Sequence, residues 1–286
     1  MRWWAEGRLL DGPEAPFDLT DRGLLLGDGL FDTAMVADGR VVRGAAHLDR
    51  LAAGCAALGM PFDRSAAGTA WAAVCAGIGR GSVRLTVTRG SGPRGVAPPP
   101  APRPRIFASA SEGLPAPFAP VRLATALIRR NDSSPAARLK TTGYLDAVLA
   151  TEAARAAGAD EPLFLNTRGN AACTGIGNLV MIAGGRLVTP PVSEGILPGI
   201  LRAELLSLAP EAGLAAEERA VDPAELLQAE ALLVTNSLRL ASPVTHLDGL
   251  ALPPLPAAAH ALFGALARAL APETGPLAVP SMEDIP

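Results

Sequence analysis

Lys140 is the residue whose type and setting most strongly indicate covalent chemistry in this sequence. It is the only lysine among 286 residues, in a chain that holds 24 arginines. Arginine can replace lysine as a surface charge, but a guanidinium stays protonated, whereas an ammonium can lose its proton and condense with a carbonyl. The retained lysine therefore favours an amine that forms a Schiff base. The alternative is a surface lysine that remains in an arginine-rich composition.

Tyr144, the only tyrosine, follows four residues after Lys140. Its phenol could donate a hydrogen bond to a hydroxyl of a cofactor held by Lys140. A half-buried tyrosine with no role in chemistry is the alternative, since the spacing between the two residues is not specific.

Two arginine-bearing segments could bind anionic groups. Arg50 lies in the run His47-Leu48-Asp49-Arg50-Leu51 and points away from the apolar stripe of a predicted helix. Arg89 and Arg94 lie in a glycine-rich loop and could hold a substrate carboxylate. A bidentate guanidinium suits phosphate and carboxylate alike. A solvated helix face and a flexible charged hairpin are the respective alternatives.

A third anion site is predicted where a glycine-flanked loop runs into a helix, in the sequence Glu194-Gly195-Ile196-Leu197-Pro198-Gly199-Ile200-Leu201-Arg202. The free N–H groups of a helix N-terminus and its dipole favour phosphate. Ser237, in Thr235-Asn236-Ser237, could add a hydroxyl to the same anion. An ordinary strand–loop–helix connection is the alternative.

The elements that must position these residues fall into two parts. In the first part, strands are predicted at 2–10, 31–43 with a turn at Asp38-Gly39, 83–88 and 105–110, and helices at 44–59 and 65–78. The second part alternates short strands at 121–128, 161–166, 172–174, 178–183, 186–189, 215–220, 231–235 and 242–247 with helices at 143–157, 199–208 and 222–229. The proline-rich tail from Ala271 is predicted to be irregular.

These patterns predict an α+β fold with a small α/β domain at residues 1–113, a linker at 114–120 and a larger, barrel-like domain at 121–286. Hydrophobic residues make up 49% and charged residues 19% of the chain, which suits a globular protein with a large core. The net charge of −3 and the absence of long charge runs give no indication of nucleic-acid or membrane binding. Three widely spaced cysteines indicate neither disulfides nor a metal site, and a cytoplasmic location is expected.

The order of several motifs along the chain carries more information than any one of them. The sequence resembles the class IV aminotransferases, the pyridoxal 5'-phosphate (PLP) enzymes of fold type IV, over roughly residues 5–250, through these segments: Asp21-Arg22-Gly23, Gly27-Asp28-Gly29-Leu30-Phe31-Asp32-Thr33, His47-Leu48-Asp49-Arg50-Leu51, Thr88-Arg89-Gly90-Ser91-Gly92-Pro93-Arg94, Leu139-Lys140-Thr141, Gly177-Asn178-Leu179 and Gly199-Ile200-Leu201-Arg202. Within the family the loop around Arg94 is most similar to D-amino-acid transaminase and aminodeoxychorismate lyase.

The resemblance implies a role for each matching residue. Lys140 is expected to hold PLP as a Schiff base and to move the substrate proton. The cofactor is expected to contact Arg50, Tyr144, Cys173, Thr174, Asn178, Ile200, Leu201 and Ser237, and the substrate to contact Phe31, Arg94 and Asn236. The expected partners are a small-molecule amino donor, a 2-oxo acid and a second copy of the chain, whose active site the Arg94 loop could serve.

One departure from the family pattern bears on the reaction. The family has a glutamate five residues before the asparagine that matches Asn178, and it pairs with the pyridine nitrogen; here Cys173 holds that position. A thiol, or the adjacent Thr174 hydroxyl, cannot keep the ring nitrogen protonated by charge, and a neutral ring is a weaker electron sink. Three interpretations remain open: a class IV transaminase, an aminodeoxychorismate lyase that forms 4-aminobenzoate and pyruvate, or a degenerate PLP-binding protein with weak activity.

Overall fold

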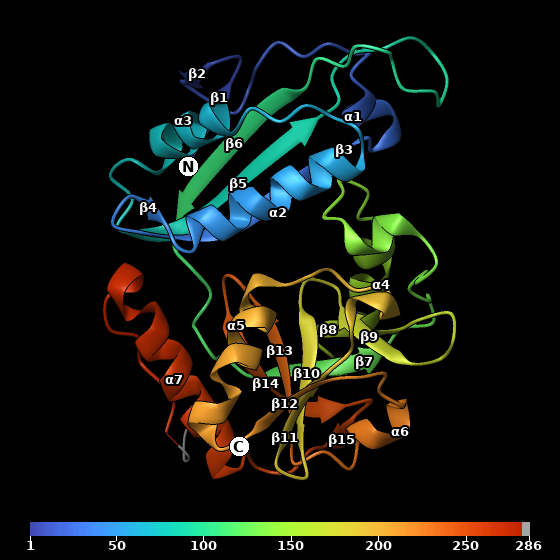
Figure 1. The fold of residues 1–286 in the computed structure, drawn as a ribbon, viewed down its shortest axis with the longest axis vertical. Helices are drawn as coiled ribbons and strands as arrows, with labels where there is room; N and C mark the ends of the chain where they lie inside the picture. Colours follow the sequence, from blue (N-terminus) through green and yellow to red (C-terminus); the bar gives the residue numbers. More distant parts are fainter. Residues whose placement is uncertain (282–286) are drawn as a thin grey trace. The chain divides into compact units, whose positions relative to one another are not determined.

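The computed structural model describes residues 1–281 and divides into two compact units. The N-terminal unit consists of Met1–Leu114 together with Leu139–Gly143, the short segment that carries Lys140. The C-terminal unit consists of Pro115–Arg138 and the chain from Tyr144 onward. Figure 1 shows the elements of both units. Among the described residues, no helix combines the length and the apolar character that a membrane span requires.

The N-terminal unit is built on one antiparallel six-stranded sheet in the order β2-β1-β6-β5-β3-β4. Its long central strands pair over most of their length, so that Phe31 lies opposite Thr86, and Thr33 opposite Arg84. The strands are β1 (Arg2–Ala5), β2 (Arg8–Leu10), β3 (Gly29–Ala37), β4 (Arg40–Val41), β5 (Arg80–Thr88) and β6 (Arg105–Glu112).

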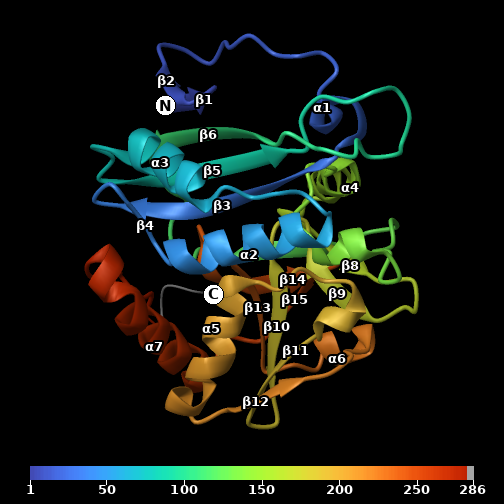
Figure 2. The same cartoon turned by 45° about the horizontal axis from the view of Figure 1, so that its top comes forward.

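Two helices, α2 (Gly44–Ala57) and α3 (Arg64–Cys75), pack on one face of this sheet (Figures 1 and 2). Leu51 and Cys55 of α2 lie one helical turn apart and are fully buried, as helical periodicity requires of a core face. They join a core that contains alternate residues of the central strands, such as Leu30 and Leu85. A short helix, α1 (Arg22–Leu26), precedes β3 and begins at Asp21, which accepts the N–H of Gly23.

The C-terminal unit contains a closed ring of six strands, β10-β13-β14-β7-β8-β9, in which β9 pairs back to β10. β11 and β12 extend the sheet beyond β10, and β15 pairs with β14. The strands are β7 (Val121–Thr125), β8 (Glu161–Leu165), β9 (Ala171–Thr174), β10 (Asn178–Ala183), β11 (Arg186–Thr189), β12 (Ala215–Glu218), β13 (Ala231–Asn236), β14 (Leu240–Leu247) and β15 (Leu250–Ala251).

Helices flank this barrel. They are α4 (Leu145–Ala156), α5 (Ile200–Leu208), α6 (Pro223–Leu226) and α7 (Ala257–Thr274), with 3-10 turns η1 (Pro135–Arg138), η2 (Val192–Glu194) and η3 (Ala209–Ala212). One apolar cluster contains Leu163, Leu179 and Val234. A second, smaller cluster contains Phe164 and Cys173. Leu163 and Phe164 are adjacent on β8 and point to opposite faces of the sheet, so the two clusters lie on opposite sides of this strand.

The fold class predicted from the sequence, an α+β two-domain fold with a barrel-like second part, is confirmed. The prediction of an irregular tail from Ala271 is wrong in its first residues, because α7 extends to Thr274 and contains Pro272 in its last turn. The apolar residues that hold α7 against the unit, including Leu266 and Leu270, are fully buried and lie ahead of that proline. Residues 275–281 form no helix or strand, and residues 282–286 lie outside the described part.

Candidate active site

Lys140 is held in the N-terminal unit by backbone pairing to β3. The N–H of Phe31 donates to the Lys140 carbonyl at 2.9 Å, and the N–H of Thr142 donates to the Gly29 carbonyl at 3.0 Å. The hydroxyl of Thr142 also donates to the Gly27 carbonyl at 2.9 Å. These bonds fix the backbone from the Lys140 carbonyl to Thr142, on both sides of Thr141. Lys140 is therefore held beside the start of β3.

The side chain of Lys140 lies over the ring of Phe31, with Nζ 4.6 Å from the ring centroid. The guanidinium carbon of Arg84 lies 3.5 Å from the same centroid. Phe31 and Arg84 share a face of the sheet because Arg84 pairs with Thr33, two residues from Phe31. A buried aromatic ring therefore brings together two cations on the sheet face opposite α2, and a carboxylate that approaches them would be attracted by both charges.

Arg50 enters a buried ionic network on the other face of the sheet. Its Nε and Nη2 donate to the two oxygens of Asp32, at 2.9 and 2.8 Å. Nδ1 of His47 lies 2.8 Å from Asp32 Oδ1, and both side chains are 1% exposed. Burial raises the pKa of Asp32, but the hydrogen bonds from His47 and Arg50 and their charges outweigh it and lower the pKa to about 2. Asp32 is therefore ionised and fixes the orientation of the Arg50 guanidinium.

Arg94 lies in the long loop between β5 and β6, residues 89–104, and its side chain is exposed. Its neighbour Gly95 has a backbone φ of +106°, a conformation that strongly favours glycine. Arg89, the other arginine predicted for this site, is buried instead, and its Nε donates to Asp28 at 2.7 Å. The two arginines therefore differ in role: Arg94 is accessible to a substrate, whereas Arg89 is buried and holds the start of the loop through Asp28.

Cys173 and Asn178 lie directly opposite each other on β9 and β10 of the C-terminal unit. Cys173 also pairs with Phe164, and both belong to the smaller apolar cluster together with Ile196. Burial raises the pKa of the Cys173 thiol, although the charge of Arg130 acts to lower it. The thiol therefore stays protonated at neutral pH. The charged group that influences its pKa is the guanidinium of Arg130.

Thr174 points to the opposite face of β9 from Cys173. Its hydroxyl donates to Oε2 of the buried Glu161 at 2.8 Å, and Arg239 donates to the other oxygen of Glu161 at 3.0 Å. Burial raises the pKa of Glu161, and the hydrogen bond from Thr174 and the charge of Arg239 only partly oppose this shift. Of the two neighbours predicted to act at one position, Cys173 alone lies on the face of Asn178.

Asn178 links three elements of the C-terminal unit. Its Nδ2 donates to the Leu197 carbonyl at 2.9 Å, which ties β10 to the loop before α5. Gly199 lies so near Asn178 that a Cβ added to it would collide with Asn178 Oδ1. On its other side Asn178 pairs with Thr235 at the end of β13, two residues before Ser237. The N-terminus of α5 and the Ser237 turn therefore both adjoin the start of β10.

The N-terminus of α5 has the features of an anion site. Gly199 is its N-cap and offers no side chain, and the first turn contains no acidic residue. The N–H groups of Ile200 and Leu201 therefore have no side-chain acceptor in the N-cap, and their dipoles favour a negative charge. Arg202, in the same run, points inward instead and donates to the Pro190 carbonyl at 2.8 Å.

Asn236 lies in a turn of the backbone, and Tyr144 lies at the start of a helix. Oδ1 of Asn236 accepts the N–H groups of Leu238 and Arg239, at 3.0 and 2.9 Å, and so shapes the turn that carries Ser237. Tyr144 is the N-cap residue of α4, with no capping hydrogen bond from its side chain. Tyr144 belongs to the C-terminal unit, whereas Lys140 belongs to the N-terminal one.

Two residues of this site, Asp32 and Arg84, were not predicted from the sequence. A signal for Asp32 was available, because a carboxylate inside the predicted apolar strand 31–43 must have a partner if that strand is buried. Arg84 gave no comparable signal, since an arginine at alternating positions of a strand is ordinary on an exposed face.

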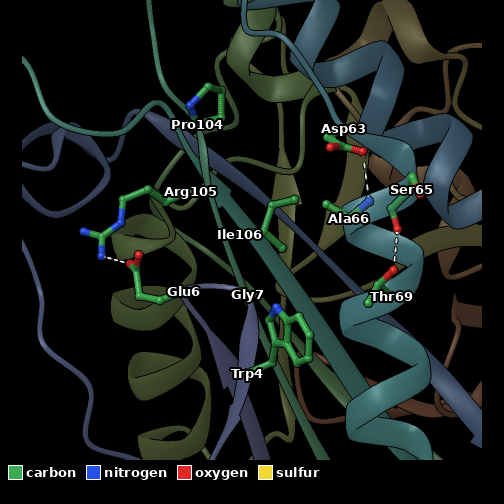
Figure 3. Close-up of a pocket in the computed structure, with 10 residues that line it drawn as sticks. All are labelled: Trp4, Glu6, Gly7, Asp63, Ser65, Ala66, Thr69, Pro104, Arg105 and Ile106. Carbon is green, nitrogen blue, oxygen red and sulfur yellow. Dashed lines mark hydrogen bonds and ion pairs between the residues drawn. The ribbon is translucent and has the colours of Figure 1, made fainter.

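A separate groove of about 630 Å³ lies in the N-terminal unit, near the start of β6 and of α3 (Figure 3). Four of its polar side chains are already paired: Glu6 with Arg105, Asp63 with the N–H of Ala66 at 2.9 Å, and Thr69 with the Ser65 carbonyl at 3.0 Å. None of the predicted site residues lines it.

Comparison with known proteins identifies the family. The model of the family "Amino-transferase class IV" matches residues 29–247. A relative from Methanocaldococcus jannaschii, provisionally named a branched-chain-amino-acid aminotransferase, is 30% identical over 87% of this chain and 88% of its own. The D-alanine aminotransferase of Bacillus licheniformis is 28% identical over 87% of this chain and 89% of its own.

Among solved structures, the 4-amino-4-deoxychorismate lyase of Pseudomonas aeruginosa is 36% identical to this chain and has a TM-score of 0.76. The similarity covers 88% of this chain and 93% of the lyase. The family match and these relatives agree with the resemblance read from the motifs. The chain belongs to the class IV aminotransferase family, and it is an enzyme.

Proposed function

We propose that this protein is a PLP-dependent transaminase that moves an amino group between a small amino acid and a 2-oxo acid. The observation that carries the proposal is Lys140: the only lysine of the chain lies in a family-matched segment, beside an aromatic ring and a second cation. Both substrates of a transaminase carry a carboxylate, and Arg84 offers that group a bidentate partner near the amine.

The residues of the C-terminal unit suit the phosphate of PLP. The α5 N-terminus lacks a side-chain cap, and Gly199 leaves space beside Asn178 that a Cβ would fill. We assign the phosphate to the N–H groups of Ile200 and Leu201 and to the Ser237 hydroxyl. Arg50 stays a prediction as a phosphate-binding cation, on the resemblance to the family alone. Tyr144 is assigned to the cofactor hydroxyl. Lys140 would hold PLP, and once the substrate amine has displaced the Lys140 amine from the cofactor, PLP would supply the electron sink that makes the substrate Cα–H acidic.

We assign separate roles in the reaction to the side chains of the chain itself. With PLP bound, Lys140 Nζ would accept the proton from the substrate Cα and later return it, which would make it the general base and acid of the reaction. Phe31 shields this amine from water on one side, because the residue is 6% exposed and its ring lies against the amine. Arg94, on its accessible loop, binds the substrate carboxylate with Arg84, and Asn236 shapes the turn beside Ser237.

A lyase is the second candidate, and Cys173 favours it. Among the described residues, the charge that acts on the Cys173 thiol comes from Arg130, and the buried Glu161 lies across β9 from it. A neutral ring nitrogen gives a weaker electron sink, and elimination needs less delocalisation into the ring than transamination does. Pyruvate release from aminodeoxychorismate without an added oxo acid would identify this reaction. A degenerate PLP-binding protein would bind the cofactor and turn over neither substrate.

We further propose a homodimer with a cytoplasmic location. Leu24, Leu25 and Leu26 are each about half exposed on α1, and Leu145, Val148 and Leu149 are exposed on α4. Consecutive exposed apolar side chains of this kind are typical of a surface that a partner covers. Analytical ultracentrifugation should give twice the chain mass of 29.1 kDa; a monomer at micromolar concentration would contradict this proposal.

The experiment that tests the function combines absorbance with amine exchange. The protein loaded with PLP should show a visible band, and it should exchange amino groups between pyruvate or 2-oxoglutarate and members of a panel of D- and L-amino acids. Lys140→Ala should abolish the band and lower the exchange rate by at least about 10³-fold. Lys140→Arg, which keeps the charge, should fail equally. A band that survives both substitutions would refute the role of Lys140.

A further inference from the structure

The β5–β6 loop that carries Arg94 is long and has no helix or strand, yet the buried side chain of Arg22 holds it by several hydrogen bonds. Arg22, at the start of α1, is 4% exposed. Its Nη1 donates to the carbonyls of Gly95 and Ala97, at 3.0 and 3.2 Å, and its Nη2 donates to the carbonyl of Val96 at 2.8 Å. Three consecutive carbonyls that follow Arg94 therefore converge on one guanidinium (α1 lies beside this loop in Figures 1 and 2).

Asp28 connects the Arg22 side chain to Arg89 at the start of the loop. Its Oδ2 accepts Nε of Arg22 at 2.8 Å and Nε of Arg89 at 2.7 Å. Burial raises the pKa of Asp28, but hydrogen bonds from Arg89 and Arg22 outweigh it, so the net pKa is lowered and the carboxylate is ionised at neutral pH. Arg89 also donates to the Leu58 carbonyl at 2.9 Å. One carboxylate thus holds the residues that fix the chain before and after Arg94.

The backbone adds to this anchor. The N–H of Arg22 donates to the Gly90 carbonyl at 3.0 Å, and the N–H of Gly92 donates to the Thr20 carbonyl at 3.3 Å. A Cβ added to Gly92 would lie 3.0 Å from Cδ of Arg22, so the loop passes close against the arginine stem. Few conformations of residues 90–97 satisfy all these contacts together, and Arg94 lies in the middle of that segment.

We propose that Arg22 is a positioning residue that fixes Arg94 in the conformation that binds the substrate carboxylate. This inference rests on the proposed role of Arg94. Arg22 contacts no substrate; it acts by converting a flexible loop into a preorganised one, so that the loop need not be ordered when substrate binds. A lysine could pair with Asp28 but could not span three carbonyls, because its donors converge on one atom.

The first test follows the loop itself. The PLP-loaded enzyme and its Arg22→Ala variant are digested briefly with trypsin, and mass spectrometry measures cleavage of the Arg94–Gly95 bond. Cleavage should be at least about fivefold faster in the variant, because proteolysis follows the population of open loop. Arg8→Ala, which removes an exposed arginine from β2, is the matched control and should leave the rate unchanged. An unchanged rate in Arg22→Ala would overturn the inference.

The second test follows the substrate. Arg94→Ala and Arg22→Ala should each raise KM for a carboxylate substrate roughly tenfold and change kcat less than KM. If Arg22 acts through Arg94, the double variant should be no worse than Arg94→Ala alone, whereas independent effects would multiply. Multiplying effects, or a normal KM in Arg22→Ala with a loosened loop, would refute positioning. A normal KM in Arg94→Ala would refute the role of Arg94 while the trypsin result still tests the anchor.

Arg22→Lys covers the case in which Arg22→Ala does not fold. It keeps a cation beside Asp28 and should retain the fold, but it should loosen the loop and raise KM in the same direction. A lysine variant with wild-type cleavage and wild-type KM would show that charge at Asp28 suffices and would contradict the proposal.

Discussion

Two buried carboxylates, one in each unit, respond to burial in opposite ways. Asp32 of the N-terminal unit is 1% exposed and has its pKa lowered to about 2. Glu161 of the C-terminal unit is 4% exposed and has its pKa raised. Desolvation is the largest influence on both groups and acts in the same direction, so the number and geometry of their partners must account for the difference.

The partners differ in the way this explanation requires. Asp32 accepts two hydrogen bonds from the mostly buried Arg50 and contacts His47. Glu161 accepts one hydrogen bond from a neutral hydroxyl of Thr174 and one from Arg239, whose side chain is 30% exposed. A bidentate, desolvated arginine therefore outweighs the effect of burial on the pKa of its carboxyl, whereas a single contact from a partly solvated arginine does not. The first arrangement suits an anchor that must keep its charge.

The largest effect is expected from Asp32→Asn. The substitution keeps the size of the side chain but removes the buried negative charge that accepts two hydrogen bonds from Arg50 and contacts His47, which should destabilise the fold by about 3 kcal/mol in denaturant unfolding. Asp49→Asn, on the helix α2 that also carries Arg50, is the control. Its ion pair with Arg64 is largely exposed and should contribute under about 1 kcal/mol. Equal losses in both variants would show that Asp32 is no stronger an anchor than a surface ion pair.

Cofactor affinity gives the same comparison a second measurement. If Asp32 orients Arg50 toward the phosphate, Asp32→Asn should weaken PLP binding at concentrations where the variant is folded, and Asp49→Asn should not. A destabilised variant with unchanged PLP affinity would restrict Asp32 to folding.

The second prediction concerns acid. The pKa of Asp32 lies near 2 in the folded state and near its ordinary value of 3.8 in the unfolded state. The stabilisation is therefore complete above pH 4 and is lost as the pH falls through 2, and it amounts to about 2 kcal/mol. The difference in unfolding free energy between the wild type and Asp32→Asn should shrink over this window. A difference that is constant from pH 5 to pH 2 would contradict the ionic account.

The sequence predicts well those features that repeat along a strand or a helix. The strands of both units and the helix that carries Arg50 follow from the spacing of apolar residues such as Leu48 and Leu51. Lys140 could be selected because its chemistry is unlike that of arginine, whatever the fold. These inferences need only local periodicity or the properties of one side chain.

Features that depend on register or on distant pairing could not be predicted in this way. Cys173 and Thr174 are adjacent, but their faces are decided by the pairing of β9 with β8, which contains a register shift beside Phe164. The contact of the Arg84 guanidinium with the Phe31 ring requires β5 to lie next to β3 in one particular register. A shift of one residue would reverse both assignments, and no local pattern contains that information.

The smallest effect is expected from Glu161→Gln. The amide keeps its oxygen for Arg239 and can donate its NH2 group to the Thr174 hydroxyl oxygen, and it removes a carboxyl whose ionisation burial disfavours. The unfolding free energy at pH 7 should therefore change by less than about 1 kcal/mol or rise. A loss as large as that of Asp32→Asn would show that Glu161 is an ionic anchor too and would remove the contrast between the units. Glu152→Gln, an exposed position on α4, is the control.

The difference in unfolding free energy between the wild type and Glu161→Gln should change with pH in a direction set by the pKa of Glu161. Because the folded pKa of Glu161 is raised above its ordinary value of 4.5, the folded state binds this proton more tightly than the unfolded state does. The contribution is present below pH 4.5 and is lost as the pH rises through the folded pKa. Relative to Glu161→Gln, the wild type should therefore gain stability when the pH falls from 8 to 5, which is opposite to the trend that Asp32 produces in acid. A wild type that instead loses stability relative to the variant over this range would mean that Glu161 is held ionised, as Asp32 is.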